Sequence, residues 1–146
     1  MRRPVRILVA VSIASAAALS ACQAPMPTAA ELAVLDYGPR PADYEQIVRD
    51  YLKTRLVEPE FAIVEFKTEP KPLHQKEAVL GDRQYGWAVC VMISDKDRRG
   101  AYEEFHPIVP YIRNGKVVAA NGDGLEQSLG LSYARSQCRE LGYEVP

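Results

Sequence analysis

The chain has little of what several protein classes require. Its 146 residues include two histidines, three cysteines and one tryptophan, and 18 basic side chains are balanced by 19 acidic ones. A net charge of −1 provides no basic field that would hold a polyanion by counterion release, which disfavours a dedicated nucleic-acid binder. A mean hydropathy of −0.20 excludes a protein with many membrane spans. The length leaves room for one domain.

No apolar run reaches the ~20 residues of a membrane-spanning helix, but one shorter run is distinctive. Residues 1–6 carry three arginines and no acid, and residues 7–21 are apolar or small. This pattern is typical of an export signal. The run has no A-x-A cleavage site and ends in Leu19-Ser20-Ala21-Cys22. The alternative is a simple secretory signal or membrane anchor in which the cysteine is incidental.

That tetrapeptide is similar to the lipobox of bacterial lipoproteins. The resemblance implies that residues 1–21 are a signal peptide, that they are removed, and that Cys22 carries the lipid. Gln23 follows the cysteine, at the position where an Asp would imply retention in the inner membrane. The resemblance therefore implies an outer-membrane anchor that faces the periplasm. Removing residues 1–21 takes away three of the 18 basic residues and none of the 19 acidic ones, which leaves a net charge of −4. We therefore expect the membrane contact to be made by the acyl chains.

The remaining chain divides into a tether and one domain. Residues 22–41 hold four prolines among small residues, a composition typical of a flexible tether. Residues 42–146 predict a single α+β domain, in which an antiparallel sheet of about four strands packs against an N-terminal and a C-terminal helix. The expected elements are a helix over 43–56, a strand over 61–66, a loop over 68–84, a strand over 85–94, a strand region over 101–113 and a helix over 131–141.

Three local patterns specify the sheet further. Residues 85–94 are apolar at both odd and even positions, which predicts a central strand buried on both faces. Pro107 and Pro110 lack a backbone N–H, so we expect them at an edge or a bulge. Asn114-Gly115 lies between two β-prone stretches and predicts a tight hairpin turn.

A wider resemblance covers about residues 36 to 138. It rests on Gly86-Trp87-Ala-Val-Cys90, Phe105-His-Pro107 and Tyr111-Ile-Arg113-Asn-Gly115-Lys-Val117, together with the helix that begins at Asp43. These motifs resemble a group of small, uncharacterised proteobacterial lipoproteins. The group usually has a second Gly before the tyrosine at position 102, where this chain has Ala101. The resemblance implies no catalytic residue.

Cys90 and Cys138 remain after Cys22 is assigned to lipid. In an oxidising periplasm, two cysteines of a small domain predict a disulfide. We favour this pairing over two buried free thiols, and over a reactive Cys90 that His106 would activate, because a thiolate is disfavoured in an apolar strand.

The polar candidates do not form a known motif. His74 and His106 have no metal-ligand spacing, so we expect no metal and no cofactor. Glu103 and Glu104 could pair with Asp95 or Asp97 as acid and base in an enzyme. Beside Lys96 and two arginines, these acids are more typical of a solvated charged turn.

Aromatic residues cluster between positions 85 and 111. Trp87, Tyr102, Phe105 and Tyr111 either line a binding surface or form a plain core. With no nucleic-acid or catalytic signature, the sequence favours a non-enzymatic accessory or binding module of the envelope, with an unidentified envelope protein or ligand as partner. The alternative is a cell-wall hydrolase, or an inhibitor of one. An enzyme should bring Asp95, Glu103, Glu104 and His106 together, whereas a binding module should expose aromatic side chains.

Overall fold

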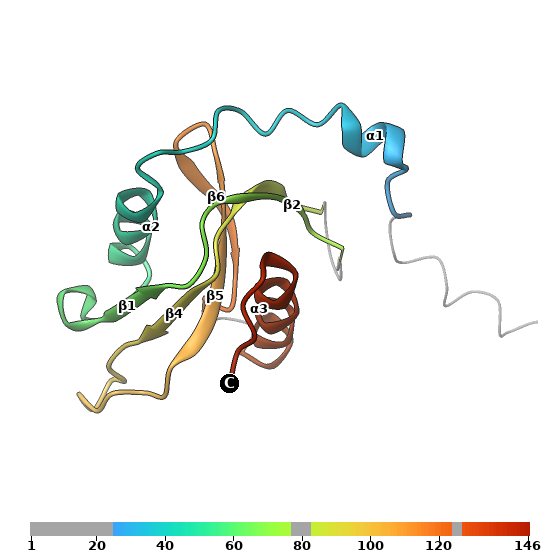
Figure 1. Ribbon diagram of the computed structural model, residues 1–146. Helices are drawn as coiled ribbons and strands as arrows, with labels where there is room; N and C mark the ends of the chain where they lie inside the picture. Colours follow the sequence, from blue (N-terminus) through green and yellow to red (C-terminus); the bar gives the residue numbers. More distant parts are fainter. Residues whose placement is uncertain (1–24, 77–82, 124–126) are drawn as a thin grey trace, which may run out of the picture.

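The computed structural model describes residues 25–76, 83–123 and 127–146, so the predicted signal peptide and Cys22 lie outside the described residues. Within those ranges the chain has an α+β fold, with helices packed on one antiparallel sheet of six strands (Figure 1). The strands are β1 (Ile63–Phe66), β2 (Lys71–His74), β3 (Tyr85–Ala88), β4 (Val91–Ser94), β5 (His106–Arg113) and β6 (Lys116–Asn121). The helices are α1 (Ala29–Ala33), α2 (Tyr44–Lys53), the 3₁₀ turn η1 (Pro59–Phe61) and α3 (Gln127–Leu141).

The strands described here lie in four rows. β1 and β2 follow one another along one edge, β4 and β3 lie beside them, and β5 and β6 complete the sheet. β3 and β4 share one register with β5, since Ala88 faces Tyr111 and Val91 faces Ile108. The expectation of about four strands is therefore too low, because two of the four rows are interrupted and each contributes two strands.

The interruption between β3 and β4 lies opposite a proline. Val89 donates its N–H to the carbonyl oxygen of Pro110 at 3.4 Å, but Pro110 has no N–H with which to return the bond. The N–H of Cys90, the next residue, binds Thr68 Oγ1 at 2.9 Å. Of the two expected positions for Pro107 and Pro110, the edge is excluded because β5 lies between β4 and β6, whereas the register with β6 shifts between Tyr111 and Ile112, next to Pro110. Pro110 interrupts the ladder inside the sheet instead.

β2 lies within the stretch 68–84, so the prediction of a loop there is wrong for this strand. It pairs with β3, with Pro72 opposite Trp87, and it forms an outer edge of the sheet. An edge strand tolerates proline because its outward backbone groups need no partner strand. Hydrophobic periodicity alone does not reveal such a strand, since its pairing depends on β3.

The two faces of the central strands support two cores, as the sequence predicts. On one face Val89, Val91 and Ile93 pack against Val48 and Leu52 of α2. On the other face the buried residues belong to the sheet and α3: Ala88, Cys90, Val109, Tyr111, Ala134, Cys138 and Leu141. Figure 1 shows α2 and α3 on opposite sides of the sheet.

Both main helices differ from the predicted ranges at one end. α2 begins after Asp43, as expected, but the Asp43 side chain makes no capping hydrogen bond, and the helix ends at Lys53. α3 begins at Gln127, earlier than predicted, and ends before Gly142, whose φ of +104° suits a glycine at a helix C-terminus.

The predicted tether contains ordered structure. Thr28 and Glu31 form a capping box that begins α1. Further on, Tyr37 packs edge-on against Tyr85 at 5.4 Å between ring centroids. The carbonyl oxygen of Gly38 accepts a hydrogen bond from Trp87 Nε1 at 3.0 Å. The chain therefore packs on the sheet before residue 42, where the sequence places the start of the domain.

The hairpin turn between β5 and β6 is confirmed. Asn114 and Gly115 have φ angles of +51° and +73°, which a type I′ turn requires at both central residues. Among the residues that the structure describes, no helix is long and apolar enough to cross a membrane.

Candidate functional site

The loop between β4 and β5, residues 95–105, holds the polar residues that the sequence singles out. Its two sides pair as a short hairpin. Lys96 and Tyr102 form an isolated antiparallel β-bridge, and the Glu103 N–H donates to the carbonyl oxygen of Asp95 at 2.8 Å. Ser94 Oγ donates to the carbonyl oxygen of Glu103 at 2.7 Å. These bonds align the two sides of the loop and place Asp95 opposite Glu103.

Asp95, Glu103 and His106 form one cluster, which we call the carboxylate–histidine cluster. Each offers one ligand atom, and these atoms all lie within 4.8 Å of one another. His106 joins the other two because it starts β5 opposite Ile93, two residues before Asp95. Asp95 and His106 are half-buried and Glu103 is exposed. The cluster therefore opens to solvent on the side of Glu103.

No cation of the described chain neutralises the two carboxylates of this cluster. None of the ion pairs among the described residues involves Asp95 or Glu103. Lys96 lies next in the chain, but its Nζ pairs with Glu58 at 3.2 Å. Asp95 Oδ1 is buried and has no hydrogen-bond partner among the residues described. A desolvated carboxylate oxygen without a partner is costly, so the cluster favours a bound cation.

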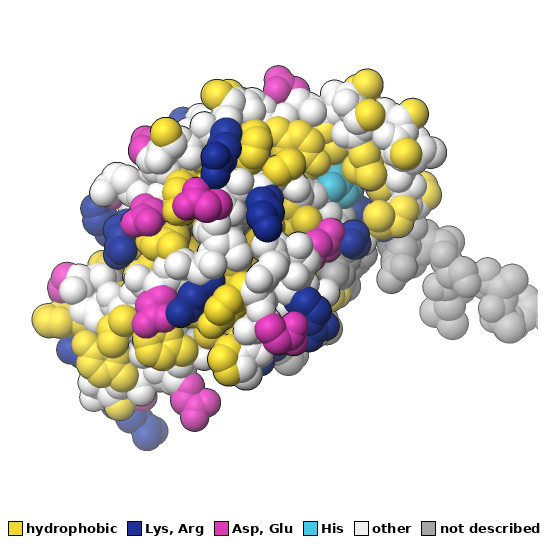
Figure 2. All heavy atoms as spheres, in the orientation of Figure 1, with side chains coloured by type: hydrophobic (Ala, Val, Ile, Leu, Met, Phe, Trp, Pro, Cys, Tyr) yellow, Lys and Arg dark blue, Asp and Glu magenta, His cyan; other side chains and the backbone are white. Residues whose placement is uncertain are grey.

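Aromatic side chains gather at the same end of the sheet. Lys96 Nζ lies over the Phe61 ring, 3.8 Å from its centroid, and 5.6 Å from the centroid of Tyr102. Tyr102 donates its hydroxyl hydrogen to the carbonyl oxygen of Phe61 at 3.1 Å. We call Phe61, Lys96 and Tyr102 the aromatic cluster. Figure 2 shows hydrophobic side chains gathered at the lower left, where Figure 1 places β1 and the loop between β4 and β5.

The four aromatic residues that the sequence selects for a binding surface divide into two groups. Tyr102 and Phe105 are exposed, at 53% and 42% of their maximum. Tyr111 is fully buried in the α3 core, so it belongs to the core and not to a surface. Trp87 is half-buried beneath the chain at Gly38. The exposed pair lies on the loop, at the opposite end of β5 from the turn at Asn114.

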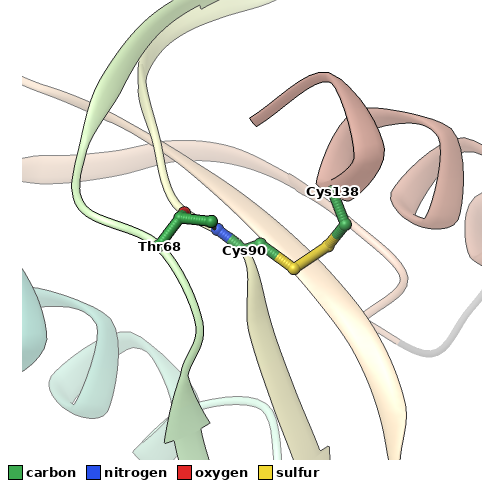
Figure 3. Close-up of a disulfide and its surroundings, with 3 residues drawn as sticks. All are labelled: Thr68, Cys90 and Cys138. Carbon is green, nitrogen blue, oxygen red and sulfur yellow. Dashed lines mark hydrogen bonds between the residues drawn. A yellow bond between two sulfur atoms is a disulfide. The ribbon is translucent and has the colours of Figure 1, made fainter. Parts of the chain in front are cut away.

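The structure contains the Cys90–Cys138 disulfide that the sequence favours, and Figure 3 shows it joining the central strand row to α3. Cys90 is held from its other side as well, because its N–H donates to Thr68 Oγ1. Both sulfur atoms are bonded, so the alternative of a reactive Cys90 activated by His106 is excluded in this state. The disulfide is structural.

His74 lies on β2, away from the cluster that contains His106. Its ring stacks on Tyr85, with 6.3 Å between centroids. Burial lowers the pKa of His74 below its ordinary value, and the positive charge of Arg83 lowers it further. The native fold therefore favours the neutral imidazole.

The sequence groups Asp95, Glu103 and His106 only as a set that an enzyme would bring together, and it assigns neither Phe61 nor Lys96 to a surface. The separations along the chain match no ligand motif, because the three residues meet only through the register of the hairpin. One signal was present: a charged turn between two strands places residues at equal distances from its centre opposite one another.

Comparison with protein-family models, with curated proteins and with solved structures finds no match for this chain. The resemblance to small proteobacterial lipoproteins stays a prediction.

Proposed function

We propose that this protein is a lipid-anchored lipoprotein of the bacterial outer membrane that binds an envelope protein from the periplasmic side. In this proposal Cys22 carries the acyl chains, residues 22–41 connect the lipid to the domain, and the loop between β4 and β5 carries the binding surface. The domain acts as a non-enzymatic accessory or binding module.

The observation that carries the proposal is the exposure of aromatic side chains at one end of the sheet. Phe61, Tyr102 and Phe105 are 49%, 53% and 42% exposed, whereas large apolar side chains such as Tyr111 are buried in the two cores. Tyrosine and phenylalanine are enriched at protein interfaces. Tyr102 is held by its hydrogen bond to Phe61 and by Lys96, so little side-chain freedom is lost when a partner binds.

Site-specific photocrosslinking in living cells tests this surface. A photoreactive amino acid at Phe105 should give a discrete crosslinked product, whereas the same amino acid at Val118, 38% exposed on β6, should not. Tyr102→Ala should then weaken binding of the purified partner by roughly tenfold or more, the loss typical of an interface hot spot. Equal crosslinking from both positions, or binding that Tyr102→Ala leaves unchanged, would contradict the proposal.

The enzyme alternative, a cell-wall hydrolase, has one supporting observation: Asp95, Glu103 and His106 converge. Glu104, which the sequence groups with them, is not part of that cluster. A hydrolase should release soluble fragments from purified peptidoglycan, and Glu103→Gln should abolish the release. An inhibitor would instead slow a hydrolase and would not need Glu103.

A further inference from the structure

We propose that Asp95, Glu103 and His106 bind a divalent transition-metal ion of the zinc type. This site goes beyond the proposed binding function and stands without it. The first argument is geometric, because the three ligand atoms lie within 4.8 Å of one another. Tetrahedral ligands ~2.0–2.1 Å from Zn²⁺ are ~3.3 Å apart, so a small closing movement completes the site. The exposed Glu103 side chain is free to make it.

The second argument is electrostatic. Two carboxylates face each other across the hairpin, and among the described residues neither has a basic partner. Asp95 Oδ1 is moreover buried without a hydrogen-bond donor. A bound cation would neutralise the pair and satisfy this oxygen, in the way that buried charges in proteins are paired or coordinate metals.

The third argument concerns the imidazole of His106. Its Nδ1 lies 3.3 Å from the carbonyl oxygen of Glu104. Because a carbonyl oxygen only accepts, this contact places the hydrogen of a neutral imidazole on Nδ1 and leaves Nε2 as the ligand atom. Metal-binding histidines commonly donate their second ring N–H to a carbonyl or carboxylate, which fixes the ring and its tautomer. His106 has this arrangement.

The ligand set selects the class of metal. Imidazole favours zinc and its neighbours in the first transition row, whereas Ca²⁺ and Mg²⁺ prefer oxygen ligands throughout. Three protein ligands leave a coordination position open for water or for a group of a partner. A metal held by Asp95, Glu103 and His106 would also clamp the two sides of the loop that carries Tyr102 and Phe105.

Isothermal titration of untagged, chelator-stripped protein with Zn²⁺ tests the site, with Ca²⁺ titrated in parallel. We expect one Zn²⁺ per chain and much weaker Ca²⁺ binding. Glu103→Gln and His106→Gln should each weaken Zn²⁺ binding by roughly 10- to 100-fold or more, since even residues that merely support a metal ligand have effects of that size.

Matched variants separate this site from general zinc affinity. His74→Gln removes the other histidine and Glu104→Gln removes the neighbouring carboxylate, and both should bind Zn²⁺ as the wild type does. If His106→Gln fails to fold by circular dichroism, Glu103→Gln decides, because its side chain is exposed. Absence of saturable binding, tighter binding of Ca²⁺ than of Zn²⁺, or equal losses in His74→Gln and His106→Gln would overturn the proposal.

Discussion

Tyr51 of α2 donates a hydrogen bond to the carboxylate of Asp123, in the turn that follows β6. Arg55, which lies just beyond the end of α2, pairs with the same carboxylate at 3.1 Å. Burial raises the pKa of the Tyr51 hydroxyl, and the hydrogen bond to Asp123 raises it further. The contact ties α2 to the turn after β6 and spans 72 residues of sequence.

Replacing Tyr51 by phenylalanine tests how much this link stabilises the fold. Tyr51→Phe should lower the free energy of unfolding by about 1–2 kcal/mol, because a part-buried hydrogen bond to a charged group is lost. Urea denaturation measures the change. Tyr44→Phe is the matched control, since its hydroxyl makes only an exposed, 3.4 Å contact with Glu69. Equal effects of the two variants would show that the link contributes nothing of its own.

The disulfide should account for a larger part of the stability. It closes a loop with a sequence separation of 48 residues, so Cys90→Ala/Cys138→Ala should lower the free energy of unfolding by ~4 kcal/mol in the chain-entropy model. Denaturation of the wild type in reducing buffer should show a similar loss. Non-reducing peptide mapping should find the two cysteines joined, and alkylation of both without reduction would contradict the bond.

The sheet faces and the hairpin turn could be predicted because their signals are local. Odd positions from Val89 to Ile93 pack towards α2, and Cys90 faces α3, as their alternating positions along the strand require. Asn114-Gly115 predicts its turn because few other residue pairs adopt positive φ at both positions.

The strand breaks could not be predicted, and the carboxylate–histidine cluster could be named only as the expectation of one alternative, because both depend on pairing between distant segments. The break between β3 and β4 lies opposite Pro110 only because the register places Val89 against this proline. Likewise, Asp95 and His106 meet through the register of β4 with β5, and neither their spacing nor their composition matches a known ligand motif. Pattern analysis finds elements, whereas this cluster arises from how those elements are aligned.

The lipid anchor is a prediction that one substitution tests. Cys22→Ser should abolish incorporation of labelled palmitate and leave unprocessed or soluble protein, because the diacylglycerol is attached as a thioether and serine has no thiol. Cell fractionation with labelling measures both results. Cys90→Ala serves as the control, because Cys90 is in the disulfide and its loss should not affect labelling. Unchanged palmitate incorporation in Cys22→Ser would refute the lipoprotein assignment.

His74 should make stability depend on pH near neutrality. Its native pKa is lowered, so the unfolded chain binds more protons as the pH falls below about 6.5, the ordinary histidine value. The free energy of unfolding should therefore fall as the pH is lowered from about 7.5 to about 5.5, and the loss should level off below the native pKa.

Two variants isolate this effect. His74→Gln stays neutral throughout, so the wild-type stability minus that of the variant should shrink as the pH is lowered. Arg83→Gln removes the second cause of the lowered pKa, and its pH dependence should lie between those of the wild type and His74→Gln. Urea denaturation at several pH values gives each curve. A wild-type curve parallel to that of His74→Gln would show that His74 has the same pKa in the folded and unfolded chains. Burial on β2 would then not lower the pKa of His74.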